Sequence, residues 1–176
     1  NGSENIRWDL TDLFNGVDDP KINESLALSG DRAVAFKHKY KNNVKDLTPL
    51  DLNHAYTQLI EVFEPIYRVH QFGSLSLSTN TSNDDVKSLS ARIEEKLSSI
   101  SNKILFFNLE LAERDDLETL ENMPGLEDFK YNLNQTHKTK KYNLSEKEEQ
   151  LINLKSLTGK SAFKKLYSEY TSSFTF

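Results

Sequence analysis

The chain has 176 residues, a length that suits a single domain. Charged residues make up 28% of it and the formal net charge is −5, which argues against nucleic acid as the main partner. The absence of cysteine excludes disulfides and thiolate metal sites and fits a reducing, cytoplasmic location. No apolar run reaches the roughly 18 residues that a membrane helix needs, so we expect no membrane partner.

Residues 1–18 are predicted to form an N-terminal arm built around one short helical turn. Trp8, Leu10, Leu13 and Phe14 would lie on the apolar face of that turn. Because the neighbours of Trp8 are apolar, we expect this side chain to be a buried anchor that ties the N-terminus to the body.

Two helices are predicted next, at about 20–43 and 49–77. Each has a cap residue, Asp19 or Thr48, followed directly by a proline, which is a strong helix start. Pro65 lies inside the second helix. A proline in a helix interior removes one backbone hydrogen bond, so we expect a kink or a local break there.

The longest apolar stripe runs from Ser82 to about Ala112, with Ser82 as the expected cap and Asp85 in the capping-box position. Its apolar residues follow one another at steps of three or four, which is typical of an amphipathic helix. They are Val86, Leu89, Ile93, Leu97, Ile100, Ile104, Phe107 and Leu111. The turn at 79–82 is short and polar, so we expect this helix and the preceding one to pack as an antiparallel pair.

Two short helices are predicted to follow, at about 115–123 and 126–141. Residues 109–128 carry eight acids and one base, whereas residues 129–142 carry four lysines and no acid. We interpret these two blocks as solvated helix faces that attract each other in the fold. A binding role for the lysines is the alternative.

Further short helices complete an all-α fold, an antiparallel bundle in which the shorter helices cover the long hairpin. Ser145 and Glu148 form a capping box that predicts a helix start. We expect Gly159 to break the chain before a last helix at 161–170. In 172–176 phenylalanines alternate with polar residues, which indicates the start of a strand. Since a strand needs a partner, we interpret the chain as a piece of a longer protein.

The residues by themselves predict no catalytic, cofactor-binding or metal-binding site. A zinc helix needs two histidines one turn apart, and none of His38, His54, His70 and His137 has such a neighbour. The sequence at 158–161, Thr-Gly-Lys-Ser, lacks the upstream glycine of a phosphate loop and is interpreted as a helix stop followed by a cap.

Three blocks of sequence resemble the oligoendopeptidase F family of zinc metallopeptidases. The first is RWDLTDLF at 7–14 and the second is LFFNLEL at 105–111. The third combines NLSEKEE at 143–149 with KSLTGKSAF at 155–163. The blocks come in the family's order at roughly the family's spacing, and the likeness extends over nearly all of the chain.

The resemblance implies that residues 1–176 are the N-terminal helical domain of such a peptidase. Its parts would be an arm at 1–18, long helices at 19–112, shorter helices at 113–171 and a linking strand begun at 172–176. Family members cut short peptides, and their N-terminal helices wall one side of a deep channel. Their zinc ligands lie far downstream, so the implied fragment has no zinc site, is inactive alone, and has the catalytic domain of its own chain as partner.

A helical adaptor or scaffold module that binds a partner helix in a groove is the competing interpretation, because long amphipathic helices fit both. The reading frame beyond Phe176 discriminates between them. A downstream His-Glu-x-x-His helix would indicate the peptidase, and a stop codon would favour the adaptor. For the isolated fragment we also expect self-association through residues 172–176.

Overall fold

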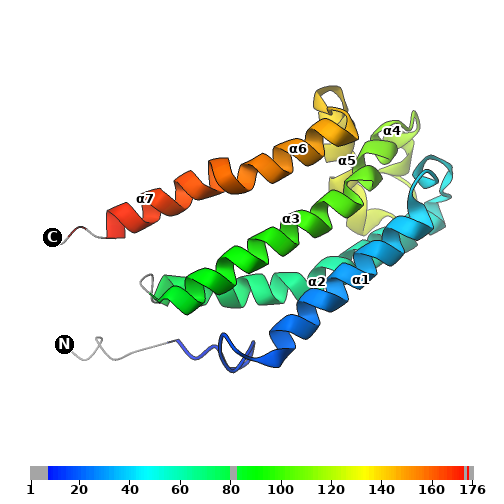
Figure 1. Ribbon diagram of the computed structural model, residues 1–176. Helices are drawn as coiled ribbons and strands as arrows, with labels where there is room; N and C mark the ends of the chain where they lie inside the picture. The colour runs from blue at the N-terminus through cyan, green and yellow to red at the C-terminus, as the bar shows by residue number, and fades with distance from the viewer. Residues whose placement is uncertain (1–7, 80–82, 173, 175–176) are drawn as a thin grey trace.

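The structure is a computed structural model that describes residues 8–79, 83–172 and 174 (Figure 1). Every regular element among the described residues is a helix, which confirms the all-α prediction. The α-helices are α1 (Pro20–Tyr40), α2 (Pro49–Thr79), α3 (Asp84–Ala112), α4 (Leu117–Leu120), α5 (Lys130–Thr139), α6 (Glu146–Ser156) and α7 (Ala162–Ser172). The shorter pieces are η1 (Val44–Asp46), η2 (Glu127–Phe129), η3 (Lys140–Tyr142) and the π-helical η4 (Leu157–Ser161).

The core lies between α1, α2 and α3, which run alongside one another in Figure 1. Helices α2 and α3 form the antiparallel pair that the short turn predicts. The stripe of α3 faces this core: Ile93 is 1% exposed and Ile100 is fully buried, while Leu97 is partly buried against the same cluster. Helix α1 packs on both partners, so the body is a three-helix bundle and not only a hairpin with small covers.

The N-terminal arm is anchored by Phe14, and the prediction of Trp8 as a buried anchor is wrong. Trp8 is 63% exposed, whereas Phe14 is 4% exposed and meets the ring of Phe72 edge-on at 5.4 Å. The carboxylate of Asp9 accepts hydrogen bonds from the backbone and hydroxyl of Thr11. This local turn lies in the chain between the exposed Trp8 and the buried Phe14.

The helix caps are the predicted kinds of residue, but the cap of α3 lies one position later than predicted. Asp19 accepts a hydrogen bond from the backbone of Lys21 and opens α1. At α3 the cap is Asn83, not Ser82, because the Asn83 side chain accepts from the N–H groups of Asp85 and Val86. Ser82 lies outside the described residues.

Helix α1 ends at Tyr40, earlier than predicted, because the chain reverses there. Asn42 adopts a left-handed backbone with φ of 68°. The Glu110 carboxylate on α3 accepts hydrogen bonds from the backbone N–H groups of Asn42 and Val44 at 2.8 and 3.2 Å. A side chain from a distant helix therefore holds the turn that stops α1.

Short elements close one end of the bundle. The predicted helix at 115–123 shrinks to one turn, α4, and the one at 126–141 divides into η2, α5 and η3. Leu120, Leu126 and Leu133 are each at most 1% exposed, so these pieces join the main core. As expected, the acidic and basic blocks meet: His137 lies 3.8 Å from Glu118, and Lys140 lies 4.0 Å from Asp115.

The C-terminal segment from α6 onward departs from two predictions. Gly159 does not break the chain, because it lies within π-helical η4, which joins α6 to α7 as one rod in Figure 1. The strand predicted at 172–176 is not confirmed: α7 includes Ser172, and residues 173, 175 and 176 lie outside the described part. None of the described helices is long and apolar enough to cross a membrane.

Candidate functional site

The rod formed by α6, η4 and α7 starts at the predicted capping box. The backbone N–H of Ser145 donates to the Glu148 carboxylate at 2.9 Å, and the Ser145 hydroxyl accepts from the backbone of Glu148. Two hydrogen bonds from Ser145 lower the pKa of Glu148: the one from its hydroxyl has the larger effect and the one from its backbone N–H the smaller. The carboxylate therefore stays ionised at the positive end of the helix dipole.

Polar contacts fasten the α6 half of the rod to the bundle. The amide of Asn153 donates to the side-chain oxygen of Asn102 on α3 at 2.9 Å. Lys41, just after α1, pairs with Glu146 at 2.8 Å, and both side chains are about one-third exposed. These contacts fix the start of the rod on two helices of the core.

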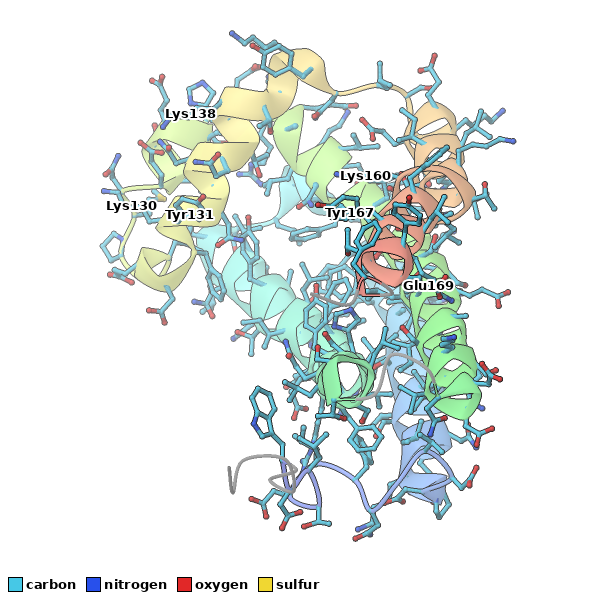
Figure 2. The ribbon with its side chains drawn as sticks, turned by 90° about the vertical axis from the view of Figure 1, so that its left-hand side faces the viewer. Lys130, Tyr131, Lys138, Lys160, Tyr167 and Glu169 are labelled. Atoms are coloured by element: carbon cyan, nitrogen blue, oxygen red, sulfur yellow. The ribbon has the colours of Figure 1, made fainter. Side chains whose placement is uncertain are left out.

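The rod carries a large set of exposed apolar side chains, which we call the C-terminal apolar face. Its members are Leu151, Ile152, Leu154, Phe163, Leu166, Tyr167 and Tyr170, and each is 48 to 72% exposed. Figure 2 shows Tyr167 projecting from α7 on the side nearer α5. The four members on α7 recur at helical spacing, so they share one side of that helix. Exposed apolar side chains gathered on one side of a helix are typical of an interaction surface.

A hollow in the bundle, which we call the aromatic groove, lies between α2 and the η2–α5 segment. Its lining residues are Tyr56, Leu59, Ile60, Phe63, Glu64 and Tyr67 on α2, with Asn108, Asp128, Phe129 and Asn132. Its volume is about 590 Å³. The apolar periodicity of α2 predicts one apolar helix face, but it does not predict that η2 packs beside that face. The residues of this groove were therefore missed by sequence reasoning.

The described residues bring no metal centre together. Across them, no group of three His, Cys, Asp or Glu side chains lies close enough to hold a metal ion. His38 is on α1, His54 and His70 are on α2, and His137 is on α5. The Thr-Gly-Lys-Ser sequence at 158–161 lies in helical η4 and forms no phosphate-binding loop.

Comparison with known proteins agrees with the motifs. An N-terminal family model described as Oligopeptidase F matches residues 109–176, the stretch from the end of α3 through α7. The Oligoendopeptidase F homolog of Borreliella burgdorferi (strain ATCC 35210 / DSM 4680 / CIP 102532 / B31) is 25% identical over 180 residues. That alignment covers 98% of this chain but 28% of the relative, so the chain spans little more than a quarter of the relative's length. No solved structure matches.

The family match covers the rod and the short helices, and the relative extends the similarity over the long helices as well. These findings confirm the resemblance that the three sequence blocks carry. They relate the chain to the N-terminal part of the oligoendopeptidase F family.

Proposed function

We propose that this chain is the N-terminal, channel-wall domain of a zinc-dependent oligoendopeptidase that hydrolyses short peptides. The observation that carries the proposal is the match of residues 109–176 to the Oligopeptidase F family model. The relative aligned over almost the whole chain bears the name of the same peptidase. The alternative, an adaptor that binds a partner helix, has no matching relative behind it.

The residues described here do not fit a zinc site, since no three metal-binding side chains gather among them. We therefore assign zinc and bond breaking to a catalytic domain elsewhere in the parent chain. The role left to this domain is to exclude folded proteins and to contact the peptide. By itself it would be inactive.

The C-terminal apolar face is the proposed contact with that catalytic domain. Its side chains on α7 are 59 to 72% exposed, and exposing so much apolar surface to water is unfavourable at about 25 cal/mol per Å². Covering it would release that cost. The polar contacts of Asn153 and Glu146 hold α6 in place, so the face is presented from a fixed base.

We also propose that residues 1–176 act as one domain. Leu120, Leu126 and Leu133, from the short helices, belong to the same apolar cluster as Ile66 and Ile93 of the long ones. A shared core couples the unfolding of the two parts. One cooperative unfolding transition is the expected behaviour.

The experiment compares the complete reading frame with residues 1–176. Purified products are incubated with quenched fluorescent peptides, with and without a zinc chelator. The proposal expects cleavage of short peptides by the longer chain, loss of cleavage with chelator, and no cleavage by residues 1–176. A complete reading frame that ends near residue 176, or one that cleaves no peptide with zinc present, contradicts it.

A further inference from the structure

The aromatic groove has a composition that the docking of a catalytic domain does not explain. We propose that it binds a short peptide at a large apolar side chain next to a cationic group, such as a lysine, an arginine or a free amino terminus. This inference rests on the proposed function, in which peptides pass along the wall that this domain forms. It adds the class of peptide that the wall prefers.

Flat aromatic faces line the groove in two pairs. The rings of Tyr56 and Phe129 stack at 4.5 Å between centroids with 10° between their planes. The rings of Phe63 and Tyr67 stack at 5.2 Å with 14° between planes. Tyr67 is 50% exposed and Ile60 beside it is 58% exposed, so apolar surface is open to a ligand. Such surfaces suit aromatic or aliphatic side chains and attract cations.

The charges at the groove are of one sign. Glu64 and Asp128 both line it and are exposed, and no lysine or arginine is among the lining residues. Two basic residues directly follow lining residues in the sequence, and both have partners elsewhere: Lys130 donates to the Asn122 side chain at 2.8 Å, and Arg68 donates to the backbone carbonyl of Asp12 at 2.9 Å. Figure 2 shows Lys130 at the outer edge of the α5 segment. Two carboxylates beside open aromatic rings favour a cation over an anion.

Tyr56 forms part of the groove wall and buries its own hydroxyl. The residue is 4% exposed, and its hydroxyl is fully buried without a hydrogen-bond partner in the described structure. Burial raises the pKa of Tyr56, so the hydroxyl keeps its proton and is a donor without an acceptor. Buried polar groups of native proteins are nearly always paired. Because the hydroxyl has no accessible surface, a ligand in the groove would meet the edge of the Tyr56 ring and not its hydroxyl.

The remaining lining residues match a peptide backbone. Asn108 and Asn132 are exposed, and each amide can both donate to a carbonyl and accept from an N–H group. A volume of about 590 Å³ is in the range of sites that hold small molecules and short peptide segments. The geometry therefore suits a few residues of an extended peptide and not a folded protein.

The test is an NMR titration of residues 1–176 with three capped peptides, Gly-Gly-Phe-Arg-Gly, Gly-Gly-Phe-Glu-Gly and Gly-Gly-Gly-Arg-Gly. We expect the first to bind most tightly and to shift the amide signals of Ile60, Tyr67 and Asn132. Glu64→Gln and Asp128→Asn should each weaken its binding about threefold, and Tyr67→Ala about tenfold. Glu95→Gln, an exposed acid on α3 outside the groove, is the matched control and should leave the affinity unchanged.

Equal binding of the three peptides, or shifts confined to other surfaces, overturns the inference. A circular-dichroism melt of each variant separates lost binding from lost folding. In the complete peptidase, Glu64→Gln should reduce kcat/KM for the Phe-Arg peptide relative to the Phe-Glu peptide. An active peptidase whose preference is unmoved by this change refutes the groove and leaves the proposed function standing. If residues 1–176 bind the Phe-Arg peptide selectively but the longer chain cleaves no peptide, the groove is supported and the proposed function is refuted.

Discussion

Arg32 on α1 donates a hydrogen bond of 2.7 Å to the backbone carbonyl of Glu61 on α2, the acceptor that Pro65 leaves without its helical partner. A proline has no N–H to bond the carbonyl four residues earlier. One turn away along α1, the Ser29 hydroxyl accepts the backbone N–H of Ile66 at 3.1 Å in a buried setting. Helix α1 thus supplies both a donor and an acceptor at the proline, and α2 continues through it.

Removing the Ser29 hydroxyl should therefore cost more than a surface change. In Ser29→Ala the buried N–H of Ile66 loses this acceptor, which should lower the free energy of unfolding by about 1–3 kcal/mol. Urea denaturation followed by circular dichroism measures this loss. Ser88→Ala, an exposed serine on α3, is the control and should change stability by less than about 0.5 kcal/mol. Equal stability of the two variants would contradict the role of Ser29.

Truncating the stripe of α3 should create a cavity in the core. Ile93 is 1% exposed, so Ile93→Ala should lower the free energy of unfolding by about 2–5 kcal/mol. The matched change Ile60→Ala removes the same atoms from a side chain that is 58% exposed and should cost less than about 1 kcal/mol. Chemical denaturation of both variants gives the comparison. Similar losses would mean that the α3 stripe does not face the main core.

The capping box should respond to acid. Its hydrogen bonds lower the folded pKa of Glu148 below the ordinary 4.5, so their stabilisation is present above the unfolded pKa and is lost as pH falls through the folded pKa. We expect Ser145→Ala to raise the pKa of Glu148 toward 4.5, measured from its carboxyl carbon shift by NMR. Ser99→Ala, away from the box, is the control. An unchanged titration of Glu148 in Ser145→Ala would show that the box does not form.

The isolated chain should self-associate through the C-terminal apolar face. Sedimentation velocity should show a mass that rises with concentration, and Phe163→Ser combined with Leu166→Ser should bring the chain back toward monomer. The version that ends at Tyr170 tests the contribution of residues 172–176. Association unchanged in the double variant but lost in the shortened chain would assign the contact to those last residues. A monomer at every concentration in all versions would contradict the prediction.

Zinc should not bind tightly to this chain. Among the described residues no three candidate ligands converge, and a stable site needs three or four. Elemental analysis after dialysis against a chelator should find far less than one zinc per chain. The complete peptidase, treated in the same way and reloaded with zinc, is the positive control. One tightly held zinc per fragment would contradict the assignment of the metal to another domain.

Local sequence determined the helices and several of their ends. The starts of α1, α2 and α6 follow from Asp19, Thr48 and Ser145, because a cap bonds backbone groups only two or three residues away. The α3 stripe predicted its buried residues, since helical spacing places them on one side whatever they pack against. The family resemblance also came from the residues alone, and the family match to 109–176 confirms it.

Tertiary structure decided what depends on distant partners. Phe14, not Trp8, is buried because Phe72 of α2 lies beside it, and α1 ends where Glu110 of α3 bonds the chain at Asn42. The aromatic groove exists because η2 brings Phe129 against Tyr56, residues far apart in sequence. Periodicity and caps report interactions within a few residues, whereas these contacts arise only when packed helices bring separate segments together.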